Sequence, residues 1–174
     1  MTNSVATLTG MNAATFLENT VNATPQLLDA DVIFGDLDGN VAGGALTVSG
    51  LLAEDTVSIR NQGVGAGQIG FFGGLVSYEG ALIGVAAGGA GGTLTVALIA
   101  GATSAAVDAL IQNLTFATSS DAPPASHGME IKVTDGAGDI LGDDDQLGDR
   151  HDHDHLFRRQ GRQAMVITDP QPGA

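Results

Sequence analysis

The chain has 174 residues, of which 26 are glycine and none is cysteine, and its formal net charge is −14. This length predicts one domain with a tail, and the lack of cysteine excludes disulfides and thiolate metal sites. The acidic charge, with only six Lys and Arg residues, argues against nucleic acid as a partner and favours divalent cations.

The sequence predicts no membrane insertion, because its most apolar window, residues 70–92, is interrupted by glycine throughout. Residues 1–17 lack the basic start and the continuous apolar run of a secretion signal. If the protein is exported, we expect its address to lie elsewhere, for example on a longer parent chain.

Short strands separated by glycine turns are the elements expected along most of the chain. Residues 5–9 are expected to form a lead strand, and the segment 21–31 to be extended through residues 26–28. Residues 44–50 and 55–60 alternate apolar and small polar side chains, as half-buried strands do. Further strands are expected at residues 31–35, 68–72, 75–78, 81–85, 93–99, 114–118 and 129–134.

One helix is predicted, over residues 103–113. Val107, Leu110 and Ile111 recur at helical spacing, and Thr103 or Ser104 is suited to cap the first turn. Many short strands with a single helix predict an all-β fold, an antiparallel β-sandwich. We expect residues 1–139 to form this module and residues 140–174, which are rich in Asp and His, to form a polar and mainly disordered tail.

The pair Asp36 and Asp38, in a turn that contains Gly39, is the strongest candidate for a ligand site. Calcium prefers six to eight oxygen ligands, and carboxylates two positions apart in a turn can reach one ion. Asp135 follows another predicted strand and is a candidate third ligand. Asp and Gly are also good turn formers, so the same residues fit plain turns without an ion.

Three segments resemble the cadherin-like repeats of large bacterial surface proteins, a family of Ig-like β-sandwiches. They are Phe16–Leu17–Glu18–Asn19–Thr20–Val21, Gly35–Asp36–Leu37–Asp38–Gly39–Asn40 and Val133–Thr134–Asp135–Gly136. The resemblance covers roughly residues 8–139. It implies calcium ligands at Asp36, Asp38 and Asp135 at one end of the module and at Glu18 at the other.

The same resemblance implies a secreted or cell-surface module that is not an enzyme. Its implied partners are neighbouring repeat modules or a cell-surface or polysaccharide ligand. The chain departs from the family pattern, since it has neither an Asp-Arg-Glu segment nor the Asp-x-Asn-Asp-Asn linker that completes the junction site. An isolated copy is therefore expected to hold part of a site and to bind calcium weakly.

His151, His153 and His155 alternate with aspartates in the tail. In an extended chain this alternation places the three imidazoles on one side, and imidazole suits zinc, nickel or copper. The favoured interpretation is a solvated low-complexity tail with incidental metal affinity, because the segment offers no packed residues to orient the imidazoles.

Motifs typical of catalysis are scarce. His127 is interpreted as a loop residue, and the segment Gly63–Val64–Gly65–Ala66–Gly67 lacks the Lys and the following helix of a phosphate-binding loop. The leading hypothesis is a calcium-binding structural or adhesive module. The alternatives are a carbohydrate-binding accessory module, which the low aromatic content disfavours, and a metal-chelating role of the tail.

Overall fold

The computed structural model describes residues 6–36, 39–136 and 161–168 of the chain. These residues form β1 (Thr7–Thr9), β2 (Ala14–Leu17), α1 (Glu18–Ala23), β3 (Gln26–Leu27), β4 (Ile33–Gly35), β5 (Ala45–Ser49), β6 (Asp55–Ile59), β7 (Ile69–Phe72), β8 (Leu75–Tyr78), β9 (Ala81–Gly88), β10 (Leu94–Leu98), α2 (Ser104–Gln112), β11 (Leu114–Thr118), β12 (Ser126–Thr134) and β13 (Gly161–Thr168).

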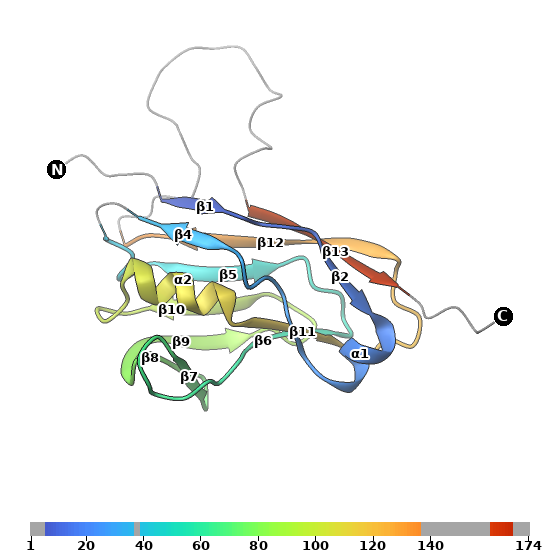
Figure 1. Ribbon diagram of the computed structural model, residues 1–174, viewed down its shortest axis with the longest axis horizontal. Helices are drawn as coiled ribbons and strands as arrows, with labels where there is room; N and C mark the ends of the chain where they lie inside the picture. Colours follow the sequence, from blue (N-terminus) through green and yellow to red (C-terminus); the bar gives the residue numbers. More distant parts are fainter. Residues whose placement is uncertain (1–5, 37–38, 137–160, 169–174) are drawn as a thin grey trace, which may run out of the picture.

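The largest sheet has the strand order β2-β13-β12-β5-β10-β9-β8-β7 (Figure 1). A second sheet has the order β3-β11-β6, and β1 pairs with β4 in a two-stranded ribbon. All the paired strands are antiparallel except β13 and β2, which are parallel. The predicted mainly antiparallel all-β class is therefore confirmed.

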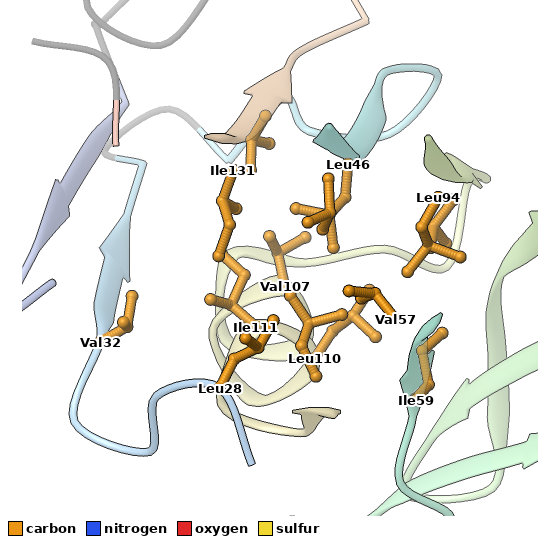
Figure 2. Close-up of a cluster of buried hydrophobic side chains, with 14 of the residues drawn as sticks. Leu28, Val32, Leu46, Val57, Ile59, Leu94, Val107, Leu110, Ile111 and Ile131 are labelled. Carbon is orange, nitrogen blue, oxygen red and sulfur yellow. The ribbon is translucent and has the colours of Figure 1, made fainter. Parts of the chain in front are cut away.

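The core lies on the face of the large sheet that is covered by α2 and by the three-stranded sheet. Figure 2 shows Val107, Leu110 and Ile111 of α2 among side chains of both sheets. Leu46, Ile83, Val96 and Ile131 of the large sheet are each at most 1% exposed. The helical spacing predicted the apolar stripe of α2, because residues three and four apart share one face.

α2 is fixed at both of its ends by side-chain hydrogen bonds. The hydroxyl of Thr103 accepts a bond from the amide of Ala106 (3.2 Å), which is the predicted N-cap. At the C-terminal end, Asn113 is buried, donates to the carbonyl of Ala109 (2.8 Å) and accepts from Nε of Arg60 (2.8 Å). The helix is thereby joined to the strand β6 that ends just before Arg60.

The sequence prediction of one helix is wrong, because residues 18–23 form α1. The stretch Glu18–Ala23 contains a single apolar β-branched residue, Val21, which is fully buried. One anchored side chain and an acidic first turn are sufficient for a helix of six residues inside a fold. Neither helix in the described ranges is long and apolar enough to cross a membrane.

Within the tail that was predicted to be mainly disordered, residues 161–168 form the strand β13. This strand pairs with β12 along six residues and with β2 along four. Its segment Ala164–Met165–Val166–Ile167 is the apolar part of the tail, and β-branched residues favour strands. The remaining tail residues, 140–160 and 169–174, lie outside the described ranges.

Candidate functional site

Two of the predicted calcium ligands lie on segments that meet at one end of the molecule. Asp36 follows β4 directly, and Asp135 follows β12 directly. The carbonyl of Asn40, four residues after Asp36, accepts a hydrogen bond from the amide of Gly136, the residue after Asp135 (3.1 Å). We call Asp36 and the segments 39–44, 98–104 and 134–136 the acidic pole (left side of Figure 1).

The backbone of the acidic pole is tied together by further hydrogen bonds. Ser104 donates its hydroxyl to the carbonyl of Asp36 (3.1 Å), which joins the end of β4 to the start of α2. The amide of Gly43 donates to the carbonyl of Leu98 (3.0 Å), and the amide of Leu98 donates to the carbonyl of Gly44 (2.9 Å). Segments from three distant parts of the sequence therefore meet at this end.

The position of Asp36 is set by contacts between β4 and α2. The amide of Phe34 donates to Oδ1 of Asp108 (2.6 Å), and Nε2 of Gln112 donates to the carbonyl of Val32 (2.9 Å) and to Oδ2 of Asp108 (3.0 Å). These hydrogen bonds hold the three-residue strand β4 against the helix α2. The side chain of Asp36 is half-buried and its Oδ1 atom is shielded from solvent.

Of the other predicted ligands, only Glu18 belongs to the described residues, and it does not lie in this cluster. Glu18 lies in the first turn of α1, at the opposite end of the molecule, as the resemblance implies (right side of Figure 1). Asp38, His151, His153 and His155 lie outside the described residues. Within the described ranges, no group of three or more His, Cys, Asp or Glu side chains is close enough to hold a metal ion.

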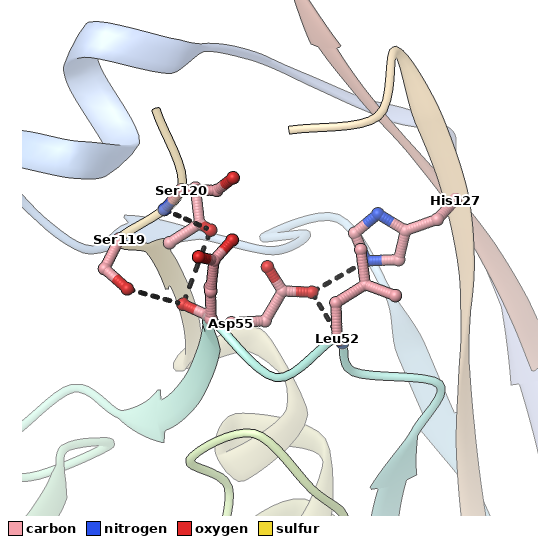
Figure 3. A network of polar contacts seen from close by, with 7 residues as sticks. Leu52, Asp55, Ser119, Ser120 and His127 are labelled. Atoms are coloured by element: carbon pink, nitrogen blue, oxygen red, sulfur yellow. Dashed lines mark hydrogen bonds and ion pairs between the residues drawn. The ribbon is translucent and has the colours of Figure 1, made fainter. Parts of the chain in front are cut away.

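A buried contact between Asp55 and His127 is the main polar feature that the sequence analysis missed. Nε2 of His127 lies 3.1 Å from Oδ2 of Asp55, and the side chains are 11% and 2% exposed. The same oxygen accepts a hydrogen bond from the amide of Leu52 (2.8 Å), as Figure 3 shows. His127 also lies against the ring of Phe116, at 6.3 Å between centroids.

This contact joins the two sheets, because Asp55 begins β6 and His127 is the second residue of β12. The interpretation of His127 as a loop residue is therefore wrong. The strand β12 begins at Ser126, three residues before the predicted start at Met129. The apolar alternation that identified the strand begins only at Met129, so periodicity alone could not include His127.

Next to this contact, the carbonyl of Glu54 accepts three bonds from the end of β11. The donors are the amide of Ser119 (3.0 Å) and the hydroxyls of Thr118 and Ser119 (3.4 Å each). The turn before β6 is thereby held to β11, and Asp55 is held in place beside His127. We infer that the contact between Asp55 and His127 is structural, because it and the hydrogen bonds around it connect strands of the two sheets. We call this pair of residues the polar clasp.

Comparison with protein-family models, with curated proteins and with solved structures finds no match to this chain.

Proposed function

We propose that the protein is a calcium-binding structural or adhesive module of a bacterial extracellular repeat protein, with no catalytic role. In this proposal the large sheet is one layer of a cadherin-like or Ig-like β-sandwich, and α2 with the three-stranded sheet is the other. The proposal includes secretion or attachment to the cell surface. Its partners would be neighbouring repeat modules or a cell-surface or polysaccharide ligand.

The observation that carries the calcium proposal is the hydrogen bond between Asn40 and Gly136. It brings together two turns that follow strands distant in sequence, and each turn carries a predicted carboxylate ligand, Asp36 or Asp135. Strand ends of a sandwich gather at its two poles, so a ligand set drawn from several turns is expected there. Backbone carbonyls in such turns also serve as calcium ligands.

Calcium is favoured over transition metals because the donors at the acidic pole are oxygens. The residues of the acidic pole offer the carboxylates of Asp36 and Asp135, the amide of Asn40 and backbone carbonyls, and none of them is Cys or His. Hard cations prefer such ligands, whereas zinc and copper prefer nitrogen and sulfur. Carboxylates gathered without a cation repel one another, so a bound cation stabilises the fold.

The carbohydrate-binding alternative has less support. Modules of that kind present several exposed aromatic side chains to stack on sugar rings, and Phe72 is the only exposed aromatic residue among those that the structure describes.

The experiment is thermal unfolding with and without calcium, at fixed ionic strength and with magnesium as a second cation. Fixed ionic strength matters because any salt screens the repulsion within a chain of net charge −14. At millimolar calcium we expect a gain of about 0.5 to 1.5 kcal/mol, as for a site with a dissociation constant of about 10⁻⁴ to 10⁻³ M. Magnesium should give less, because it demands a stricter geometry.

Asp36→Asn, Asp38→Asn and Asp135→Asn should each remove this gain. Asp121→Asn is the matched control, because it removes the same charge from an exposed aspartate in the loop between β11 and β12. The control should keep the full response to calcium. An unfolding temperature that calcium leaves unchanged, or an equal response in all four variants, would contradict the proposal.

A further inference from the structure

A row of apolar side chains crosses the outer face of the large sheet, on the side away from α2. Phe72 of β7 lies opposite Leu75 of β8, Leu75 lies opposite Val85 of β9, and Val85 lies opposite Ala97 of β10. Residues directly opposite in paired antiparallel strands share a face. Phe72, Leu75 and Val85 are 85%, 50% and 45% exposed, and Ala97 is also exposed. We call these four residues the outer row.

The outer row does not belong to the core. Side chains alternate between the two faces of a strand, and Val76 and Val96, the sequence neighbours of Leu75 and Ala97, are fully buried. Ala97 lies opposite Ala45 of β5, which is half-buried, and Ala45 lies opposite Thr134 of β12. The exposed part of the apolar row therefore ends at β10, and Lys132 lies on the same outer face of β12.

The charge distribution makes this part of the molecule unusual. Glu79 is the only charged residue between Arg60 and Asp108, although the chain as a whole carries a net charge of −14. Glu79 lies in the turn between β8 and β9, where its Oε1 accepts a hydrogen bond from the amide of Gly67 (2.8 Å). The outer row is therefore an uncharged apolar strip on an acidic molecule.

The free edge of β7 is closed to strand addition, which leaves the face of the sheet for association. Oε1 of Gln62 accepts from the amide of Ile69 (3.1 Å), and Oδ1 of Asn61 accepts from the amide of Phe71 (3.2 Å). The amide of Gln62 in turn donates to the carbonyl of Ile69 (2.7 Å). These groups occupy the backbone positions that another strand would need at this edge.

We propose that the outer row is a self-association surface that packs against the same row of a second copy of the chain. Two copies repel each other wherever their acidic surfaces approach, and repulsion is weakest across this strip. A charged partner would find no opposite charge on this row. A second outer row, in contrast, is likewise apolar and uncharged. The contact would be isologous, with two sheets packed face to face. This inference goes beyond the proposed function, because it involves neither calcium nor the acidic pole.

The dimer is expected to be weak and reversible. A fully buried aromatic side chain removes roughly 150 to 250 Å² from water, and the other three residues are smaller and partly covered. The row therefore offers less than the roughly 800 Å² per partner of a standard interface. We expect a dissociation constant on the order of 10⁻⁴ M, as for transient contacts of small area.

The test is sedimentation velocity of the full chain from micromolar to millimolar concentration. We expect a concentration-dependent dimer that becomes at least tenfold tighter between low and moderate salt, because salt screens the repulsion between the acidic copies. Val85→Lys should abolish the dimer, because it places a charge of each copy in the contact. Ile33→Lys is the matched control, since it adds the same charge at a 61% exposed aliphatic residue of β4, outside the large sheet, and should leave the dimer intact.

A second measurement locates the contact. The chain has no cysteine, so Ala97→Cys introduces a single thiol in the outer row, and Ile33→Cys introduces one elsewhere. Mild oxidation should cross-link the first variant into a covalent dimer and leave the second monomeric. A chain that stays monomeric at millimolar concentration, or a Val85→Lys variant that associates like the unmodified chain, would overturn the proposal, and so would equal cross-linking of the two variants.

Discussion

The two halves of the large sheet are assembled in different ways. Strands β7, β8, β9 and β10 follow one another along the chain and pair in that order, through two-residue turns at residues 73–74 and 79–80 and a glycine-rich connection at residues 89–93. Strands β5, β12, β13 and β2 pair with partners far away in sequence. Ser49 of β5, for example, lies opposite Glu130 of β12, about 80 positions later.

The difference teaches which part of the fold is specified locally. Each hairpin in the first half has its register fixed by its own turn, whereas the register in the second half depends on the burial of one face. Pairing of distant segments must first offset a larger loss of chain entropy. We therefore expect the hairpin half to form early in folding and the other half to form late.

The largest effect on stability is predicted for truncating one core isoleucine in each half of the large sheet. Ile83 of β9 is 0% exposed and Ile131 of β12 is 1% exposed. Ile83→Ala and Ile131→Ala should each lower the free energy of unfolding by about 3 kcal/mol, since each removes buried methyl groups and leaves a cavity. Stopped-flow folding and unfolding in denaturant should separate them, with slower folding for Ile83→Ala and faster unfolding for Ile131→Ala.

The exposed residue Leu82, next to Ile83 on β9, provides the control. It is 43% exposed, so Leu82→Ala should cost clearly less than either core change and should leave both rate constants close to their original values. If the two core substitutions change the folding and unfolding rate constants in the same proportion, the two halves form together and the expected order of folding is wrong.

The sequence predicted the hairpin half better than the other half. Alternating apolar residues bounded by glycine identified β7 to β10 to within three residues at every boundary. The same signals are weak in β13, which is separated from its partner β12 by residues 135–160, and in α1, whose helix depends on the burial of Val21. Sequence patterns predict strands that pair through short turns. β13 and α1 depend instead on contacts with segments distant in sequence, which such patterns do not show.

The candidate site shows the same division. The sequence made Asp36 and Asp135 candidate calcium ligands because each follows a strand and precedes a glycine turn or lies within one, and this role stays a prediction. The contact between Asp55 and His127 could not be predicted, because the two residues are about 70 positions apart and neither belongs to a recognised motif. Only the packing of β6 near β12 brings these two side chains together.

The next largest effect is expected for this polar clasp, which joins the sheets in the part of the fold made from distant segments. Asp55→Asn removes the charge from a side chain that is 2% exposed and faces His127, and it should lower the free energy of unfolding by about 2 kcal/mol. A double-mutant cycle with His127→Leu should give a coupling free energy of about 1 to 2 kcal/mol in denaturant unfolding. The coupling should change little with salt, because the contact is buried.

Glu54→Gln is the matched control for Asp55→Asn, since Glu54 is the preceding residue and its side chain is exposed. It loses the same charge, but the carbonyl of Glu54 keeps its hydrogen bonds to β11. The stability of this variant should stay within about 0.5 kcal/mol of the original. Additive losses in the Asp55 and His127 cycle would show that the two side chains do not stabilise each other.

The smallest effect concerns the turns that define the hairpin half. Gly74, in the turn between β7 and β8, has a φ of +83°, and an added Cβ would lie 3.1 Å from the carbonyl oxygen of Ala86. Gly74→Ala should therefore cost about 1 to 2 kcal/mol, because a side chain is disfavoured in the left-handed region. Gly92, in the connection between β9 and β10, has no positive φ and no atom within 4 Å of the added Cβ. Gly92→Ala should leave stability unchanged or raise it by up to about 1 kcal/mol, since it restricts the unfolded chain. The unfolding temperature should therefore fall for Gly74→Ala and stay the same or rise for Gly92→Ala. An equal change in both variants would mean that the turn between β7 and β8 does not fix its hairpin.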